Sequence, residues 1–294
     1  MTTMTDEIRV VSAGRGAGWW LDGWRLFTPG VFTWIGIIII YILVAIMISV
    51  IPYVGDVGHW LLTPVFAAGL MVGCQAVARG ERLRVSHLFE GFQGPHFVTL
   101  IIIGAVNLAM VLAIVAIASV GVLGVLHMTD ALRLGVIGDP LGTLDELTTR
   151  LGAGGLLATL LLLLIAAVFG MLNWFSPALV ILKGAKPLDA MKKSFIACLR
   201  NWLPFLVYGL VAVLFAIAVM LVFTAIIFGF GATAMFSGSG GDWGAVIGAI
   251  ILLGVLMFAS VLIVLPIVFG ATYAGYRDIF VGADVVQSQQ PAPR

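Results

Sequence analysis

The chain of 294 residues is 62% hydrophobic and only 10% charged, with a mean hydropathy of +1.17 and a net charge of +1. Soluble domains carry about 25% charged residues, so this composition excludes a water-soluble globular protein and makes lipid the main solvent. The small net charge gives no reason to expect a nucleic-acid partner. The two cysteines, Cys74 and Cys198, are too few for a disulfide framework, and we expect both to be reduced packing residues.

The predicted organisation is a single membrane domain between two polar ends. Residues 1–18 are polar and are expected to form a disordered N-terminus, residues 19–280 the membrane domain, and residues 281–294 a flexible tail. The N-terminus does not have the pattern of a cleaved signal peptide, so the first span should insert and remain. Six apolar runs exceed the length of about 20 residues that a bilayer requires. They lie at about residues 32–51, 59–78, 97–126, 154–182, 203–230 and 243–273.

A short amphipathic segment precedes each odd-numbered span. The segments are residues 19–27, 79–93 and 182–204. In the first, Trp20, Trp24 and Phe27 share one helical face, which is typical of a helix lying in the membrane interface. In the third, Pro187 suits the first turn of a helix. The apolar face of that helix would consist of Leu188, Met191, Phe195, Leu199 and Trp202.

A spacing of seven residues recurs just before each odd span. The pairs are Phe27 with Trp34, Phe89 with His96, and Phe195 with Trp202, and the even spans contain Pro64, Pro177 and Pro266. The alternative explanation is that junctions between loops and spans attract aromatic residues in general. We interpret the spacing as internal repetition. The predicted fold is therefore all-α, a polytopic membrane bundle of six transmembrane helices in three hairpin repeats, each preceded by a short amphipathic interface helix.

The basic residues predict how the chain is oriented. Thirteen of the 15 Lys and Arg residues fall on one side of the predicted spans. By the positive-inside rule both termini lie in the cytoplasm of a bacterial inner membrane, and residues 129–152 form a periplasmic loop. The basic residues of the third interface segment are candidate contacts to anionic lipid, or they only fix the topology. They are Lys183, Lys186, Lys192, Lys193 and Arg200.

Three motifs carry a resemblance to a known family. They are GWWLDGWRLF at residues 18–27, TPVFAAGLM at 63–71, and RGERLRVSHLFEGF at 79–92. With them the chain resembles uncharacterised six-span inner-membrane proteins of proteobacteria over about residues 19–280. These proteins are distantly similar to the membrane domain attached to some glycerophosphodiester phosphodiesterases. The resemblance implies a fold but no activity, and the soluble phosphodiesterase domain with its acidic metal ligands is absent here.

The spans offer little chemistry. Residues 32–51, 97–126 and 203–230 contain no Asp, Glu, Lys or Arg, which disfavours an ion-coupled transporter or a channel. The polar span residues are candidates for lining a groove, or they connect neighbouring helices by hydrogen bonds. They are Asn107, Asn173 and Gln75.

Two pairs of residues have the spacing of half a metal site. Asp56 lies three residues before His59, and His87 lies three residues before Glu90. Two ligands without two more nearby are weak evidence for a metal. We therefore expect no metal site, no cofactor and no catalytic residue.

The function that these observations favour is non-catalytic. The leading hypothesis is a component that binds or transports lipid or another hydrophobic molecule, or that scaffolds an envelope complex. Its partners would be membrane lipids, further copies of the chain or another inner-membrane protein, and not nucleic acid. The alternative is a small-molecule exporter or permease that intramembrane carboxylates do not drive, with a water-accessible cavity lined by Asn107, Asn173 or Gln75. An intramembrane enzyme is a weaker third hypothesis.

Overall fold

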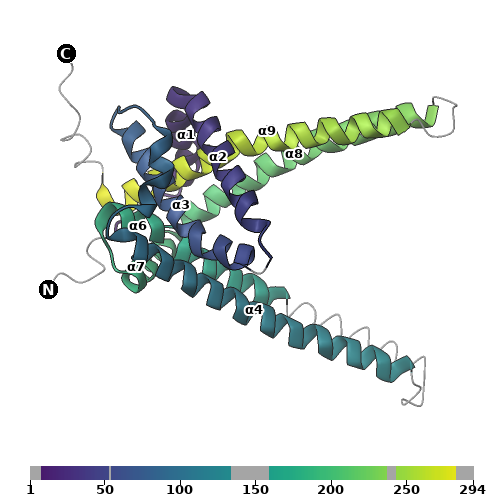
Figure 1. Ribbon diagram of the computed structural model, residues 1–294, viewed down its shortest axis with the longest axis horizontal. Helices are drawn as coiled ribbons and strands as arrows, with labels where there is room; N and C mark the ends of the chain where they lie inside the picture. Colours follow the sequence, from purple (N-terminus) through teal and green to yellow (C-terminus); the bar gives the residue numbers. More distant parts are fainter. Residues whose placement is uncertain (1–7, 53, 134–158, 237–242, 283–294) are drawn as a thin grey trace.

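The computed structural model describes residues 8–52, 54–133, 159–236 and 243–282, and within these residues the chain forms helices and no strand (Figure 1). The predicted all-α class is confirmed. Six of the helical segments are long and apolar enough to cross a membrane. The elements are α1 (Arg15–Phe27), η1 (Thr28–Gly30), α2 (Val31–Ser49), α3 (Val54–Ala78), η2 (Val85–Phe92), α4 (His96–Arg133), α6 (Ser176–Lys183), α7 (Pro187–Arg200), α8 (Trp202–Phe236), α9 (Trp243–Tyr276) and η3 (Arg277–Val281).

The helices are arranged as three units of an interface helix followed by a hairpin. In the first unit α1 precedes α2 and α3, and in the third α7 precedes α8 and α9. In the second unit a 3-10 helix, η2, takes the place of the α-helix, and α4 pairs with a span made of residues 159–173 and α6. The short elements and the helix ends gather in a head, from which the long hairpins project (Figure 1).

Each interface helix packs on the even span of the preceding unit, and the first unit closes on the third. Helix η2 packs on α3, α7 packs on α6, and α1 packs on α9. Glycines allow two of these contacts. A β-carbon on Gly91 of η2 would overlap the carbonyl oxygen of Val65, and a β-carbon on Gly23 of α1 would overlap that of Ile267. Close backbone approach at small residues is the usual way in which membrane helices pack.

The first and third units repeat in register. The two glycines lie against the carbonyl oxygens of Val65 and Ile267. Each of these two residues directly follows a proline inside a helix, Pro64 or Pro266. Sixteen residues after each proline stands a glycine in a left-handed or positive-φ conformation, Gly80 (φ 77°) and Gly282 (φ 76°). Such glycines stop a helix because they adopt positive φ without strain. This shared spacing supports internal repetition.

The fourth span departs from the other two even spans because it is broken. Residues 159–173 are helical, Trp174 and Phe175 form a bend, and α6 restarts with Pro177 in its first turn. The break leaves the Met171 carbonyl and the Phe175 amide without helical partners. The hydroxyl of Ser194 in α7 donates to Met171 O at 2.6 Å and accepts from Phe175 N at 3.0 Å. A single side chain of the interface helix therefore repairs the break.

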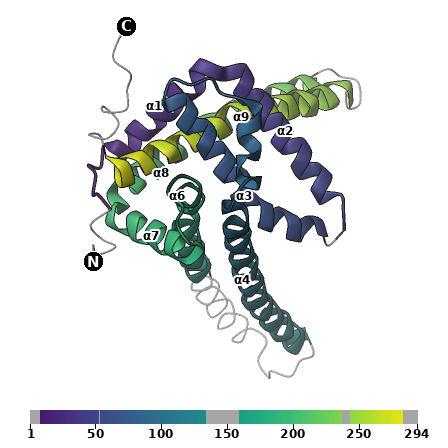
Figure 2. The same ribbon diagram turned by 60° about the vertical axis from the view of Figure 1, so that its left-hand side comes forward.

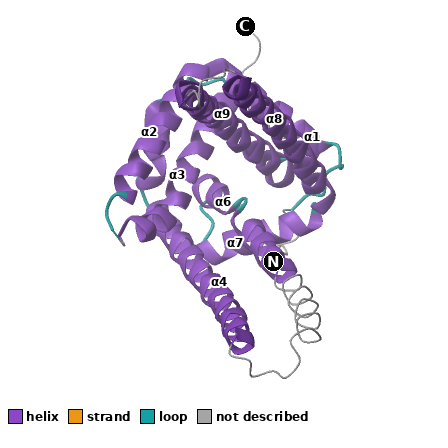
Figure 3. Ribbon diagram, turned by 90° about the vertical axis from the view of Figure 1, so that its right-hand side faces the viewer, coloured by secondary structure: helices purple, strands orange, loops and turns teal. Residues whose placement is uncertain are grey.

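The core lies around α3. In the most apolar 18-residue stretch of α3, 56% of the residues are buried within the protein, whereas in that of α8 none is buried. Viewed along the hairpins, α3 and α6 lie inside a ring of the other helices (Figure 3). Helix α4 and the α8–α9 hairpin leave the head in different directions, which two views show (Figures 1 and 2). The side chains of α8 beyond Leu210 are mostly exposed, and in a bilayer they would face lipid.

Several boundaries differ from the expected ones. The expected disorder of residues 1–18 does not extend to residues 8–18, because Ile8 is buried and α1 already begins at Arg15. Two hydrogen bonds join this segment to Asn201 at the junction of α7 and α8, from Val11 N to Oδ1 at 2.9 Å and from Nδ2 to Arg9 O at 3.0 Å. The expected periplasmic loop and C-terminal tail fall mostly outside the described residues. Of the loop, residues 129–133 extend α4, and of the tail, residues 281–282 close η3.

The faces of two interface helices also differ from the expected ones. In α1 the most buried aromatic residue is Trp19, which is off the predicted stripe, whereas Trp24 is half exposed. The predicted apolar face of the third interface segment is largely exposed, at Leu188 and Leu199 of α7 and at Trp202, the first residue of α8. The buried face consists instead of Ala190, Met191, Ser194, Ala197 and Cys198. The prediction holds for Met191 but is wrong for Leu188, Leu199 and Trp202, because close packing on the broken fourth span selects small residues.

Candidate functional site

A cavity lies between α8 and α9, and we call it the α8–α9 groove. Its volume is about 560 Å³, which is within the range of small-molecule sites. It is open along the hairpin, on the part that projects from the head. On α8 its walls include Ala212, Ala216, Val219, Met220 and Phe223, and on α9 Met257, Ser260, Val261, Val264 and Val268.

The spacing of these residues explains why a groove forms. The α8 positions 212, 216, 219, 220 and 223 follow one face of an α-helix, as do positions 257, 260, 261, 264 and 268 of α9. Two of the α8 residues, Ala212 and Ala216, have only a methyl group to fill the space between the helices. Larger side chains, among them Phe215 and Phe223, border that space. Small residues one turn apart therefore hollow the face, and larger neighbours form its rim.

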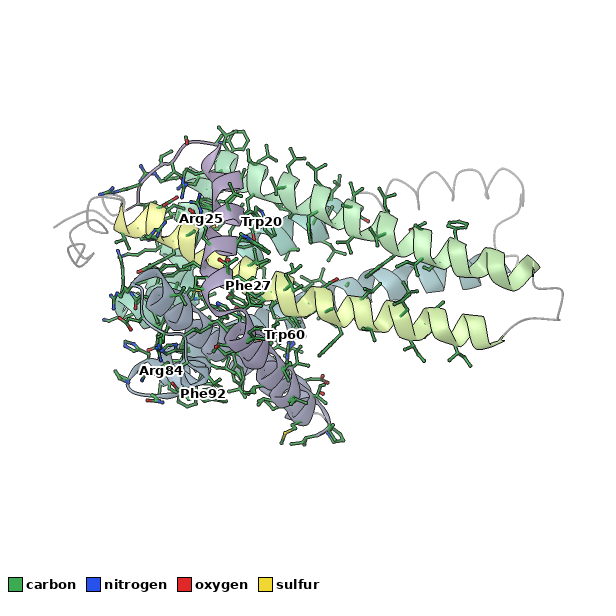
Figure 4. All side chains as sticks on the ribbon, turned by 90° about the horizontal axis from the view of Figure 1, so that it is seen from above. Trp20, Arg25, Phe27, Trp60, Arg84 and Phe92 are labelled. Atoms are coloured by element: carbon green, nitrogen blue, oxygen red, sulfur yellow. The ribbon has the colours of Figure 1, made fainter. Side chains whose placement is uncertain are left out.

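The inner end of the groove is formed by Trp20 of α1, which crosses the hairpin there (Figure 4). The indole Nε1 of Trp20 donates to the carbonyl oxygen of Tyr208 at 3.1 Å. The Trp20 ring also stacks on the Tyr208 ring, with 4.9 Å between centroids and 17° between planes. Because its single polar atom is satisfied by the backbone, Trp20 presents hydrocarbon to the groove.

The lining offers no charge and almost no polarity. The hydroxyl of Ser260 donates to Leu256 O of its own helix at 2.7 Å, so it too is satisfied. None of the lining residues is acidic, basic or a histidine. The groove can therefore hold an apolar chain by van der Waals contact, and it supplies no group for acid–base or nucleophilic chemistry.

The three polar residues expected to line a groove lie elsewhere. Asn107 of α4 is buried, and its amide oxygen has no hydrogen-bond partner among the described residues. Asn173 donates to Phe169 O of its own helix at 2.9 Å, and among the described residues no hydrogen bond joins Asn173 to Asn107. Gln75 is half-buried in α3. None of the three lines the α8–α9 groove.

The basic residues of the third interface segment are divided between two environments. Lys183 is tied to η3, because its Nζ donates to Phe280 O at 2.9 Å and lies 5.7 Å from the centre of the Phe280 ring. Lys186, Lys192 and Arg200 are exposed, and Lys193 is half exposed. The Lys183 ammonium thereby joins two units of the fold.

An ionic cluster at the junction of α1 and η3 was not expected from the sequence. The carboxylate of Asp278 accepts from Arg15 Nε at 2.6 Å and from Trp19 Nε1 at 2.9 Å. Arg15 also pairs with Asp22 at 2.8 Å, and Arg277 lies 3.8 Å from Asp22. The signal in the sequence was two isolated acidic residues within otherwise basic segments. The cluster joins the first unit to the third and involves no site residue that the sequence suggested.

The two half metal sites do not gain further ligands. Within the described part of the chain, no three His, Cys, Asp or Glu side chains come together. His87 is engaged differently, since its Nδ1 accepts the backbone N–H of Arg84 at 3.2 Å and so caps η2. His59 contacts the neighbouring Trp60 ring edge-on, and Asp56 is exposed.

Comparison with known proteins places the chain among membrane proteins. It is 28% identical over 274 residues to a Burkholderia thailandensis protein named a probable inner membrane protein, with 92% of each chain covered. No family model matches the chain. No solved structure matches it either. Together with the six apolar helices, this likeness supports an integral, multi-pass membrane protein.

Proposed function

We propose that the protein is a non-catalytic component of the bacterial inner membrane that holds the hydrocarbon part of a lipid, or a similar hydrophobic molecule, in the α8–α9 groove. The observation that carries this proposal is the groove itself. It is a cavity of about 560 Å³ with apolar walls from two membrane-spanning helices and a tryptophan at its end. The resemblance to a phosphodiesterase membrane domain concerns the fold, and we propose no phosphodiesterase activity.

The bound chain is held by shape more than by hydrophobicity. A lipid chain in the bilayer is already in hydrocarbon, so entering the groove removes no apolar surface from water. The gain comes from close contacts with fixed walls, and each atom pair contributes about 0.1–0.2 kcal/mol. We therefore expect binding that exchanges with the bilayer and depends on the width of the groove at Ala212 and Ala216.

The orientation belongs to the same proposal. The basic residues of α1, α7 and η3, and those of the loop between α3 and η2, are all part of the head, while Arg133 ends α4 at its far tip (Figure 1). The positive-inside rule then places the head and both termini at the cytoplasmic face. There Lys186, Lys192 and Arg200 would meet anionic lipid, and each basic group contributes about 1 kcal/mol of attraction.

An exporter of small molecules is the second candidate, and Asn107 favours it. A buried amide oxygen without a partner within a span calls for a donor, which a water or a polar solute would supply. The exporter predicts that Cys introduced for Asn107 reacts with a water-soluble thiol reagent in intact membranes. Protection of that Cys, with reaction of the same reagent at the exposed Asp56→Cys, would exclude a water-filled path at Asn107.

The groove proposal is tested by filling the groove. Ala216→Trp would occupy the space between α8 and α9, whereas Ala218→Trp places the same ring two residues along α8, outside the lining. Native mass spectrometry of the protein released from native membranes measures the lipid retained by each variant. We expect Ala216→Trp to lose retained lipid and Ala218→Trp to keep it. Equal retention in both variants, with both folded, would contradict the proposal.

A further inference from the structure

A second cavity lies in the head, between the start of α2 and the loop that follows α3, and we call it the α2–α3 cleft. Its volume is about 500 Å³. Its walls are unlike those of the α8–α9 groove, because they combine apolar, hydroxyl and charged side chains. They are formed by Pro29, Gly30, Thr33, Val77, Gly80, Glu81, Arg82 and Leu83.

The loop that carries the charged residues is fixed by the end of α3. Gly80, at φ 77°, donates its N–H to Val77 O at 3.0 Å, and Glu81 donates its N–H to Ala76 O at 2.9 Å. These two bonds form a Schellman motif, which ends the helix and sets the direction of the following residues. Glu81 and Arg82 are therefore held side by side at the cleft by backbone geometry.

The cleft contains two opposite charges that form no ion pair with other described side chains. Glu81 and Arg82 are both exposed, and neither forms an ion pair with a described residue. Thr33, in the first turn of α2, adds a hydroxyl that makes no hydrogen bond to a described residue. An adjacent acid and base with a hydroxyl donor suit a ligand that carries both a cationic and an anionic group.

The surroundings of the cleft place that ligand in the membrane interface. Phe32, next to Thr33, is 90% exposed, and Leu43, Ile46 and Met47 continue an exposed apolar surface along α2. Such a surface on a spanning helix faces lipid chains. A ligand seated in the cleft would therefore have its polar part among Thr33, Glu81 and Arg82 and its apolar part along α2.

We propose that the α2–α3 cleft binds the headgroup of a zwitterionic amino-phospholipid. Arg82 and Thr33 bind the phosphate, Glu81 binds the ammonium group, and the acyl chains lie along α2 from Phe32. Glu81 makes the site selective, because it attracts the ammonium group and repels a headgroup that carries only negative charge. The cleft is built from other helices than the α8–α9 groove, so this proposal does not depend on the proposed function.

The test is a competition between two lipids in nanodiscs. The full-length protein is reconstituted in an equimolar mixture of phosphatidylethanolamine and phosphatidylglycerol, and native mass spectrometry measures which lipid it retains. We expect the wild-type protein to prefer phosphatidylethanolamine. Glu81→Gln should shift the preference toward phosphatidylglycerol by about fivefold, and Arg82→Gln should lower retention of both lipids by about fivefold.

The control is Arg84→Gln, which removes an exposed arginine of the same loop that does not line the cleft. It should behave like the wild-type protein, and Ala216→Trp, which removes lipid from the α8–α9 groove only, should keep the wild-type dependence on Glu81 and Arg82. A wild-type preference for phosphatidylglycerol, or an unchanged ratio in Glu81→Gln, would overturn the proposal. Equal binding of soluble glycerophosphoethanolamine would also overturn it, because the site would then not need the acyl chains.

Discussion

Gly23 of α1 lies directly against the backbone of Ile267 in α9, so closely that a β-carbon on Gly23 would overlap the Ile267 carbonyl oxygen. These residues are far apart in the sequence, and their contact joins the first hairpin unit to the third. The equivalent contact, between Gly91 and Val65, joins the second unit to the first. The head is therefore a closed arrangement in which each interface helix holds the hairpin of its neighbour.

Gly23→Ala tests this closure. The added methyl group must push α1 away from α9, and overpacking of this kind costs about 1–3 kcal/mol. Gly36→Ala is the matched control, because no atom lies within 4 Å of the β-carbon it would add. We expect a lower melting temperature in detergent for Gly23→Ala and an unchanged or higher one for Gly36→Ala, since Ala favours a helix. Similar melting temperatures would show that the contact does not hold the head together.

The ionic cluster makes a second prediction. Asp278 accepts two hydrogen bonds, from Arg15 and Trp19, and hydrogen bonds to charged groups contribute about 1.5–3 kcal/mol. Asp278→Ala should therefore lower the melting temperature clearly. Asp56→Ala removes an exposed carboxylate in the first hairpin and should have little effect. If the two variants have the same melting temperature, the cluster contributes nothing to stability.

A third prediction concerns the N-terminal segment. Asn201 holds Arg9 and Val11 through its amide, and Arg9 N also donates to Ile279 O at 3.0 Å. Asn201→Ala removes two of these bonds, so local opening of residues 8–12 should become more frequent. We expect trypsin to cleave after Arg9 about tenfold faster or more, as read by intact mass. Leu199→Ala, at an exposed neighbour, should keep the wild-type rate, and an unchanged rate in Asn201→Ala would refute the tether.

Burial of Cys198 in α7 predicts a slow thiol. Removal from solvent raises the pKa of Cys198 to about 12, so at pH 8 the thiol stays protonated and reacts slowly. Maleimide should label Cys198 slowly in the folded protein and rapidly after denaturation in SDS. Leu199→Cys, at an exposed position, should react rapidly in the folded protein. Rapid labelling of Cys198 in the folded protein would contradict the packing of α7.

The same shift gives a pH dependence. The pKa of Cys198 in the folded protein lies above its ordinary value of 9.0, so the folded state binds this proton more tightly. The stabilisation is complete below pH 9 and is lost as the pH rises toward 12. Cys198→Ala should therefore lose less stability than the wild-type protein between pH 8 and pH 10.5. Identical pH profiles would argue against the buried, neutral thiol.

The six apolar helices were predictable because hydropathy and length alone specify a span. Pro187 at the start of α7 was predicted from first-turn geometry and is confirmed. The closure of the head was not predictable, because it depends on glycines such as Gly23 and Gly91, whose role appears only when the facing backbone is known. Pro177 is a point where the fourth span could be expected to kink, but the hydrogen bonds that stabilise the break before α6 were not predictable, since the Ser194 hydroxyl comes from another helix.

The groove was also outside what the sequence could predict. The sequence suggested polar span residues such as Asn107 as the lining of a groove. The groove is instead formed where Ala212 and Ala216 have small side chains. Two alanines one turn apart are common in apolar helices. Whether the space beside them is filled depends on the side chains of the partner helix. The uncharged spans therefore suggested an apolar ligand, but nothing in the sequence was a reason to propose the space between α8 and α9 as its site.

The most direct test of the proposed function is photo-crosslinking with a phospholipid that carries a diazirine on its acyl chain. The protein is labelled in native membranes, and peptide mass spectrometry locates the modified residues. The groove predicts modification concentrated on its lining, at Met220 of α8 and Met257 of α9, and lost in Ala216→Trp but kept in Ala218→Trp. Modification spread evenly over the exposed faces of α2, α4 and α8, and unchanged in Ala216→Trp, would show that no chain is held there.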